Sequence, residues 1–436
     1  MKNQLLKNQD GMVLVTAMMF MAILFLLGTA GYLIASIDLQ TSGNARAAKH
    51  AFYDAEAGVQ YAIARMQTGL EAGTFSLPSA VNGAEPLPIS AVPSGYNFTY
   101  EGDEITWLAN NVYEMTVYGG GARNSAAKLV VTFKRASKIE FAAFGDVSFD
   151  GVNAAAVYSY DHRDAPDNQP GDPDFESTGQ ADIGTNGDLL LHNKIFIDGD
   201  VALGADESEN PASVVDQGAT VSGALGEEIG RVDPDPFDVL EPGYDALFAS
   251  AKASYDNGTL IVDDGATREL TTGTYYFDEI YIKNGVLNID ATFGPVDIYV
   301  QGPVTIDTGQ TLNIINDYGN DVTFRLTDPP GGLSGPDIFI AKNGSDVNMT
   351  GQPTEFAIFS DSAAGIRFHN SSELKGVFYA PSGEIEMDNG NGVYGSVWGK
   401  NILIKNSVDL YFDTALLDEY PTNKLPLLSW FDGRND

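Results

Sequence analysis

An uninterrupted apolar run from Gly11 to Ile37 constrains this chain more than any other feature. No charged residue lies between Asp10 and Asp38. A bilayer core of about 30 Å needs roughly 20 apolar residues in a helix, so the run is long enough to cross a membrane. Lys2 and Lys7 precede it, and the positive-inside bias places them in the cytoplasm. We therefore expect the long remainder of the chain on the other side of the membrane.

The apolar run continues into a second helical pattern. A secretory signal peptide would have an apolar region of only about 7–15 residues, and a plain uncleaved anchor would not explain the pattern beyond Asp38. From Asp38 to Leu70 there is no proline, the first being Pro78. Apolar residues recur there at helical spacing: Phe52, Ala55, Val59, Ala62, Ile63, Met66 and Leu70. The pattern predicts one helix over 12–70, transmembrane over 12–37 and then one-sided, with a globular partner covering its stripe.

Three features in this region carry a family resemblance. They are a short basic leader ending in Gly11, an apolar run that begins at Met12, and the stretch AFYDAEAGVQYAIARM at 51–66. Together they resemble the N-terminal domain of PilX-type minor pilins of the type IV pilus family, whose motif step here is Ala55, Glu56, Ala57 and Gly58. In that family a prepilin peptidase cuts after the glycine and methylates the new amino terminus. The resemblance implies a leader peptide of residues 1–11, cleavage between Gly11 and Met12, and N-methylation of Met12.

One position departs from the usual pilin pattern. Most major pilins have glutamate at the fifth mature position, where its carboxylate is thought to neutralise a neighbour's amino terminus, and this chain has Thr16. A subunit without that acid resembles one that starts or caps a filament, although a threonine is equally compatible with a neutral helix position. Further along, Gly28 and Gly31 are small enough to let other helices approach closely.

Residues 71–138 are expected to form a linker and a small pilin-type sheet. The first part is rich in Gly, Pro, Ser and Ala, which is typical of loops. Three short runs then have strand character: Tyr96–Tyr100, Val112–Tyr118 and Lys128–Lys134. An antiparallel sheet made from them would bury the apolar stripe of the helix, and nothing here indicates site chemistry.

From residue 139 to about 415 the chain changes to short β-rich runs joined by Asn, Gly and Asp corners. This predicts a right-handed parallel β-helix-like domain, with a β-sandwich as the alternative. The segment Gly376–Asp413 also resembles the β-helix-like domains found behind PilX-type N-termini. The fold class is therefore α+β, mainly β. The predicted strands are Lys194–Ile197, Val296–Val300, Val304–Asp307, Leu312–Ile315, Val322–Leu326, Ile338–Ala341, Phe356–Phe359, Val377–Tyr379, Glu384–Met387, Val393–Trp398, Ile402–Ile404 and Leu410–Phe412.

Other segments interrupt or end this domain. Asp161–Glu176 and Val232–Asp245 are acidic and proline-rich, and they are expected to be long loops. Tyr244–Tyr255 has the pattern of a short helix laid on one face. The tail at 416–436 is apolar enough to dock as a cap on the exposed last coil.

The net charge of −36 lies almost entirely outside the first 70 residues. An acidic domain of this kind repels nucleic acid and anionic lipid headgroups, so neither is an expected partner for it. The chain contains no cysteine, which removes thiol chemistry and does not conflict with export.

Site chemistry beyond the pilin features is weakly marked. Asp172, Asp174, Asp233 and Asp235 offer the oxygen ligands that calcium prefers, but no calcium-loop spacing is present, so the expectation is no cofactor with calcium as the rival. The histidines are scattered, and Arg325 and Arg367 fall in strand runs, where structural ion pairs are expected. Paired carboxylates are uninformative in so acidic a chain. We therefore expect no enzyme and no catalytic residue.

The sequence as a whole predicts a minor pilin of a pilus or secretion pseudopilus. The expected partners are the prepilin peptidase, other pilins, the assembly machinery, and inner-membrane lipid before assembly. The expected location is the bacterial inner membrane, with the large domain in the periplasm, and later the pilus or cell surface. The domain would serve assembly or adhesion, with Tyr158, Tyr160 and Trp398 as candidates for stacking on sugars if they are exposed, although buried packing is the commoner fate of such residues. The alternative is a membrane-anchored adhesin or carbohydrate-binding protein outside any filament, and a remote alternative is a polysaccharide-active enzyme.

Overall fold

The chain folds into two compact units, which we describe separately. The computed structural model describes residues 3–78, 84–89, 92–109, 112–163, 170, 175–192, 194–206, 213–229, 231–237, 239, 243–316, 321–333, 335–348, 351–370, 373–390, 392–422 and 425–432, with the backbone alone for 3–12, 227–228, 427–428 and 430–432. The helix–sheet unit comprises Met1–Ala136 and Asn423–Asp436. The parallel-sheet unit comprises Ser137–Thr422.

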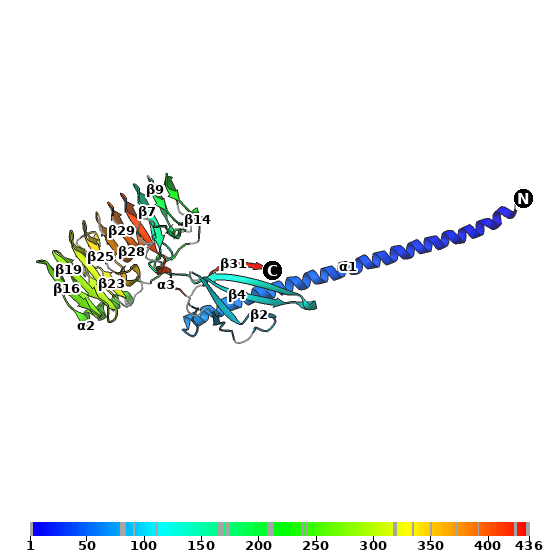
Figure 1. Ribbon diagram of the computed structural model, residues 1–436, viewed down its shortest axis with the longest axis horizontal. Coiled ribbons are helices and arrows are strands. Elements are labelled where there is room, and N and C mark those ends of the chain that lie inside the picture. Colours follow the sequence, from blue (N-terminus) through cyan, green and yellow to red (C-terminus); the bar gives the residue numbers. More distant parts are fainter. Residues whose placement is uncertain are drawn as a thin grey trace. The chain divides into compact units, whose positions relative to one another are not determined.

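A single long helix, α1 (Asn3–Glu71), dominates the helix–sheet unit (Figure 1). Its 69 residues span on the order of 100 Å at the usual rise per residue. The chain has no helix-breaking proline before Pro78 and carries apolar residues at helical spacing throughout. The predicted continuous helix over 12–70 is confirmed.

The second half of α1 is covered by a six-stranded sheet with the order β1-β3-β4-β5-β31, in which β2 also pairs with β4. All its pairings are antiparallel. Its strands are β1 (Ala84–Pro86), β2 (Phe98–Tyr100), β3 (Glu104–Ala109), β4 (Val112–Gly120), β5 (Ala126–Lys134) and β31 (Leu427–Asp432). The three predicted strands correspond to β2, β4 and β5. Strands β1, β3 and β31 were not predicted.

Small residues hold α1 close to this sheet. Buried residues recur along one face, and most are small: Ala47, Ala51, Ala55, Val59, Ala62, Ile63 and Met66. On the sheet side, a Cβ added to Gly119 would lie 1.9 Å from the backbone oxygen of Ala51. The helix backbone therefore lies directly against β4, and glycine is needed there for steric reasons.

The parallel-sheet unit is built from coils of three strands. Within it β15 pairs with β18, β16 with β19 and β17 with β20, all in parallel, so each strand lies beside its counterpart in the next coil. Apolar residues alternate inward along the strands, as in β20 (Val296–Gln301), where Val296, Ile298 and Val300 are buried. The prediction of a mainly β fold with a large parallel sheet is confirmed.

Three ladders run along the stack. The first contains β16 (Ala266–Thr271), β19 (Gly285–Asp290), β22 (Thr311–Ile315), β25 (Asp346–Val347), the starts of β28 (Glu373–Asp388) and β29 (Gly392–Lys405), β30 (Asp409–Asp413), β7 (Ala156–Tyr160), β10 (Phe196–Ile197) and β13 (Thr220–Val221). The second contains β17 (Gly273–Phe277), β20, β23 (Val322–Thr327), β26 (Phe356–Ser360), the middles of β28 and β29, the start of β6 (Ala143–Val152), β8 (Ile183–Thr185), β11 (Val201–Leu203) and β14 (Leu225–Glu228). The third contains β15 (Thr259–Val262), β18 (Glu279–Ile282), β21 (Val304–Ile306), β24 (Asp337–Ala341), β27 (Gly365–Phe368), the ends of β28, β29 and β6, β9 (Asp188–His192) and β12 (Val214–Gln217).

The order of the coils in space differs from their order in the chain. The chain enters in the middle of the stack at β6 and winds to one end at β14. It then crosses to the opposite end at β15 and winds back, until β29 pairs with β6 and β30 with β7 (Figure 1). The entry and exit segments lie side by side, because Ser137 bridges to Pro421 and the Lys138 amide donates to the Tyr420 carbonyl oxygen at 2.6 Å.

This order corrects the expectation for the tail at 416–436. The last coil is not an exposed end, because β6 and β7 cover it, so it needs no cap. The tail instead forms the short helix α3 (Leu416–Glu419) and then β31, which pairs with β5 in the helix–sheet unit. Leu425 is buried in the core of that unit, and the backbone of β31 adds a strand to the small sheet.

The crossing between the two ends lies on the second ladder. It contains α2 (Gly243–Tyr255), which confirms the predicted short helix. Phe248 of α2 packs edge-on against Tyr299 at 5.4 Å between ring centroids, and the Tyr244 hydroxyl donates to the Phe359 carbonyl oxygen at 3.1 Å. The crossing therefore covers part of one face of the stack.

Candidate functional site: an exposed apolar helix

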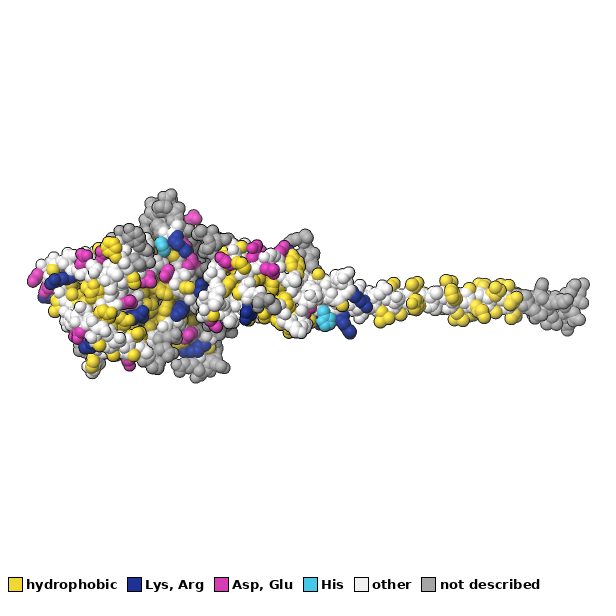
Figure 2. Space-filling model, turned by 90° about the horizontal axis from the view of Figure 1, so that it is seen from below, with side chains coloured by type: hydrophobic (Ala, Val, Ile, Leu, Met, Phe, Trp, Pro, Cys, Tyr) yellow, Lys and Arg dark blue, Asp and Glu magenta, His cyan; other side chains and the backbone are white. Residues whose placement is uncertain are grey.

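The first half of α1 exposes large apolar side chains around its whole circumference. Val13, Leu24, Phe25 and Ile37 are all exposed, with Leu24 at 65% and Phe25 at 72%. None of this apolar stretch is buried within the chain, and Figure 2 shows its hydrophobic side chains exposed along the helix. Exposed apolar surface on this scale is not stable in water, so it requires lipid or other helices around it.

The residues of the predicted processing and packing sites lie along this half. Gly11 and Met12 fall inside α1, and their side chains are outside the described part. Thr16 lies further along the same apolar stretch. Gly28 and Gly31 have open space where a Cβ would be, so helix packing at these glycines stays a prediction.

The Ala-Glu-Ala-Gly step at residues 55–58 joins the helix to its sheet. Ala55 is fully buried, and a Cβ on Gly58 would lie 2.7 Å from Cγ1 of Val117. The Tyr100 hydroxyl donates to the Gly58 carbonyl oxygen at 2.8 Å, and burial raises the pKa of this tyrosine. The motif therefore has a packing role within the chain, and Glu56 is its half-buried polar member.

The aromatic residues singled out for sugar stacking are mostly buried. Trp398 is 2% exposed and donates from Nε1 to the Pro234 carbonyl oxygen at 3.0 Å, and Tyr160 is 3% exposed. Tyr158 is half-buried and stacks on Tyr411 at 5.5 Å between ring centroids. Of the two alternatives, Trp398 and Tyr160 therefore have buried packing and are excluded as stacking platforms.

The acidic segment at 232–235 is tied to the second ladder. The Asp235 carboxylate accepts hydrogen bonds from the Tyr379 hydroxyl at 2.8 Å and from the Val239 amide at 3.1 Å. The Asp233 carboxylate accepts from the Asp235 amide at 3.0 Å. These oxygens hold the crossing in place, which leaves less capacity for a cation. Asp172 and Asp174 lie outside the described residues.

Among the described residues, one cluster has the ligand types of a metal site, and the sequence did not predict it. Asp161, His162 and Asp413 bring their ligand atoms within 4.8 Å of one another. His162 Nδ1 lies 2.6 Å from Asp413 Oδ2, and Arg163 pairs with Asp161 and Asp418. Burial alone would lower the pKa of His162, but the hydrogen bond and charge of Asp413 raise it above its usual value. His162 and Arg163 thus already form ion pairs with Asp413 and Asp161. The sequence could not have predicted this cluster, because Asp413 lies about 250 residues from His162 in the chain.

Of the two arginines expected in structural ion pairs, the structure confirms one. Arg367 lies 2.8 Å from Glu386 and 3.6 Å from Asp337. Arg325 forms no ion pair within the described part of the chain and instead lies over the rings of Tyr299 and Phe359. For Arg325 the expectation is wrong.

Comparisons with known proteins agree with the two-unit organisation. Residues 10–60 match the PilX N-terminal family, and residues 231–419 match a domain of unknown function, DUF7305. No curated protein sequence matches the chain.

Solved structures give only distant likenesses. They include an ice-binding protein from the Antarctic ascomycete Antarctomyces psychrotrophicus, with 12% identity and a TM-score of 0.29 over 63% of this chain and 98% of that one. An ice-binding protein from an Antarctic biological consortium has 12% identity and a TM-score of 0.31 over 63% and 87%. The competence-associated pilin ComZ from Thermus thermophilus has 13% identity and a TM-score of 0.30 over 89% and 98%. TM-scores this low do not define a shared fold, and nothing about ligands follows from them.

The long apolar helix fits a single-pass, membrane-anchored protein. More particularly, residues 10–60 are similar to the PilX N-terminal family, and the match at 231–419 is consistent with a separate ectodomain.

Proposed function

We propose that this protein is a minor pilin of a type IV pilus or a related pseudopilus. One observation carries the proposal: α1 exposes large apolar side chains over its first half and buries small ones against its own sheet over its second half. The first half must therefore be satisfied outside the chain, by lipid before assembly and by neighbouring pilin helices afterwards. The protein would act as a structural subunit of a filament.

The assembly step begins with processing. The prepilin peptidase cuts between Gly11 and Met12 and methylates Met12, which removes the charged leader. The apolar helix then leaves the membrane and packs among other pilins, with Gly28 and Gly31 allowing close approach. The absence of an acid at Thr16 favours a position where no neighbour's amino terminus has to be neutralised.

A parallel-sheet unit of 286 residues is difficult to repeat along a tightly wound filament. This favours a place at the filament tip or in the priming complex, where one copy suffices. The parallel-sheet unit, which we interpret as a β-helix, would face the periplasm before assembly and the surroundings of the cell afterwards. There it would serve adhesion or assembly.

Mass spectrometry of the amino terminus tests the processing. The full chain, produced with a prepilin peptidase, should lose residues 1–11 and carry a methyl group on Met12. Gly11→Val should block the cut because the peptidase requires a small residue there, and Gly28→Val is the matched glycine control that should leave it intact. An intact Met1 in the wild-type chain would contradict the pilin assignment and leave the membrane-anchored adhesin.

Immunogold labelling of the parallel-sheet unit on sheared filaments tests the position. Label confined to filament ends supports a tip subunit, and label along the whole shaft excludes it. If the missing acid sets the position, Thr16→Glu should move some label into the shaft, whereas Thr29→Glu on the same helix should not.

A further inference from the structure

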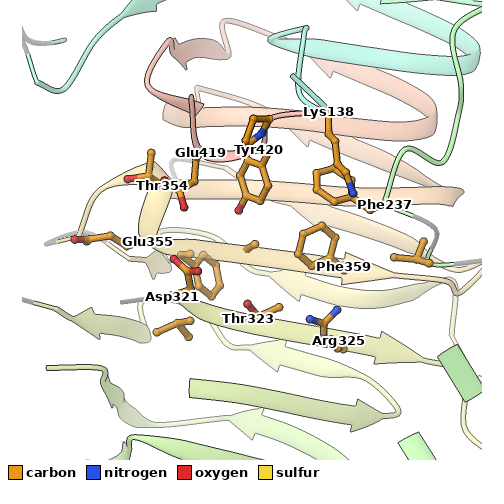
Figure 3. A pocket seen from close by; sticks show the side chains of 15 residues that line it. Lys138, Phe237, Asp321, Thr323, Arg325, Thr354, Glu355, Phe359, Glu419 and Tyr420 are labelled. Atoms are coloured by element: carbon orange, nitrogen blue, oxygen red, sulfur yellow. The ribbon is translucent and has the colours of Figure 1, made fainter. Parts of the chain in front are cut away.

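A cavity of about 420 Å³ opens on the second ladder of the parallel-sheet unit (Figure 3). Strands β23 and β26 form its floor, the entry segment supplies Lys138, the crossing supplies Phe237, and the exit segment supplies Glu419 and Tyr420. Its size lies in the range of about 300–1,000 Å³ that is usual for small-molecule sites. Five separate stretches of chain thus meet around one hollow.

The cavity has an acidic end and a basic end. Figure 3 shows Asp321, Glu355 and Glu419 on one side, and Lys138 and Arg325 on the other. Burial raises the pKa of both Asp321 and Glu419, and each is raised further by a neighbouring carboxylate. No described cation forms an ion pair with either acid, so their oxygens are free to accept hydrogen bonds from a ligand.

The basic end is unusual for so acidic a chain. Neither Arg325 nor Lys138 forms an ion pair with any described residue. The guanidinium carbon of Arg325 lies 6.0 Å from the Tyr299 ring centre and 5.8 Å from that of Phe359, and its Nε is buried without a hydrogen-bond partner. Lys138 Nζ lies 5.1 Å from the Phe237 ring centre. Two positive groups are thus held on aromatic rings and left unneutralised.

Aromatic rings line the middle and the basic end of the cavity. Phe237 packs 4.9 Å from Phe359 and 5.3 Å from Tyr420, measured between ring centroids. In Figure 3 Tyr420 lies between the acidic side chains and Lys138, and Phe359 lies on the basic side, between Lys138 and Arg325. Such rings provide an apolar platform for the C–H face of a sugar.

We propose that this cavity binds a saccharide unit that carries a carboxylate, of the uronic-acid type. The ligand carboxylate would accept hydrogen bonds from Arg325 and Lys138, its ring would lie on Phe359 and Tyr420, and its hydroxyls would donate to Asp321 and Glu419. A neutral sugar would leave the two cations unpaired, and a simple anion would make no use of the rings or the acids. The inference deepens the adhesive role proposed above and rests on it only for its biological purpose.

Isothermal titration of the full chain in detergent micelles tests this directly. D-galacturonate and D-glucuronate are the probes, and D-galactose and D-glucose are their neutral counterparts. At least one uronate should bind saturably, and roughly tenfold more tightly than its neutral counterpart, because a charge-assisted hydrogen bond is lost in the neutral sugar. Failure of both uronates to bind, or equal binding of the neutral sugars, would overturn the proposal.

Variants locate the binding. Arg325→Met and Lys138→Met should each weaken uronate binding roughly tenfold. Lys375→Met is the matched control, because Lys375 Nζ also lies over a ring, 5.5 Å from the centre of Tyr394, but outside the cavity. Equal weakening by all three changes would overturn the site. Calorimetric melting verifies folding, and Lys138→Met keeps the test open if Arg325→Met unfolds.

These titrations need no filament and no peptidase. A chain that is correctly processed but binds no uronate would contradict the cavity proposal alone. A chain that binds uronate but keeps its leader would contradict the pilin proposal alone.

Discussion

The first half of α1 is apolar all round and the second half is apolar on one face, and the apolar side chains of the two halves differ in size. Before residue 40 the exposed side chains are mostly Leu, Phe, Met, Ile and Val. After residue 46 most of the buried ones are alanine or glycine: Ala47, Ala51, Ala55, Gly58, Ala62 and Gly69. Small residues allow one rigid sheet to lie against the helix backbone at a single register, whereas large ones fill space against a fluid or a changing set of neighbours. Residue size thus distinguishes the half whose apolar side chains are covered by the chain's own sheet from the half whose apolar side chains need lipid or other helices.

The largest effect is expected from enlarging a residue where β4 lies against the backbone of α1. Gly119→Ala would place a Cβ 1.9 Å from the Ala51 backbone oxygen, so helix and sheet would have to separate. We expect a loss of about 3 kcal/mol in the stability of the helix–sheet unit. Hydrogen exchange of β4 and β5 measures it. The matched change Gly28→Ala, where nothing lies within 4 Å, should leave that exchange unaltered.

A charge introduced into the exposed first half of α1 tests whether that half alone enters the membrane. Leu24→Arg puts an arginine near the middle of the apolar run and should cost about 2.5 kcal/mol on membrane insertion. The measurement is the fraction of chain recovered with membranes. Tyr53→Arg, at a position 49% exposed in the second half, should not change that fraction. Equal losses for both variants would show that the halves do not differ in this way.

The smallest expected effect concerns the stability of the parallel-sheet unit. Because α1 packs on the small sheet alone, we expect this stability not to depend on either half of α1. The pKa of His162 is raised by Asp413, so its stabilising contribution is complete below the unfolded-state value of about 6.5 and is lost as pH rises through the folded value. Calorimetry should find this unit more stable at about pH 6 than at about pH 8. His162→Gln should abolish the difference at a loss of about 1.5 kcal/mol at the lower pH. A matching shift in the helix–sheet transition would contradict the independence of the two units.

The local sequence pattern was enough to predict α1, α2 and most of the strands from β20 to β30. The helix is fixed by an unbroken apolar run, and strands such as β20 by alternation that any neighbour would bury. Strand β3 (Glu104–Ala109) was missed although turn-type pairs flank it in the sequence, Gly102-Asp103 before it and Asn110-Asn111 after it.

The pairings that join distant parts of the chain could not be predicted. Every coil has a similar inward pattern, so the sequence does not determine that β29 lies beside β6. The apolar tail was assigned to the wrong partner for the same reason, because Leu427–Asp432 would suit many edges and only the fold places it on β5. The cavity was also out of reach, since Lys138, Phe237, Arg325 and Tyr420 meet only through this order of coils.

The side-by-side entry and exit at Ser137 and Pro421 have a consequence for how such a protein is built. The two strands that flank the insertion, β5 and β31, are antiparallel neighbours, and the Lys134 amide donates to the Pro426 carbonyl oxygen at 3.1 Å. A hairpin turn could connect β5 directly to β31, so the whole parallel-sheet unit is topologically a single loop of the small sheet. Exchange of one such loop for another would alter what the subunit presents without touching the strands that it interrupts. Because two covalent connections hold it, any pull on the unit would be shared between β5 and β31.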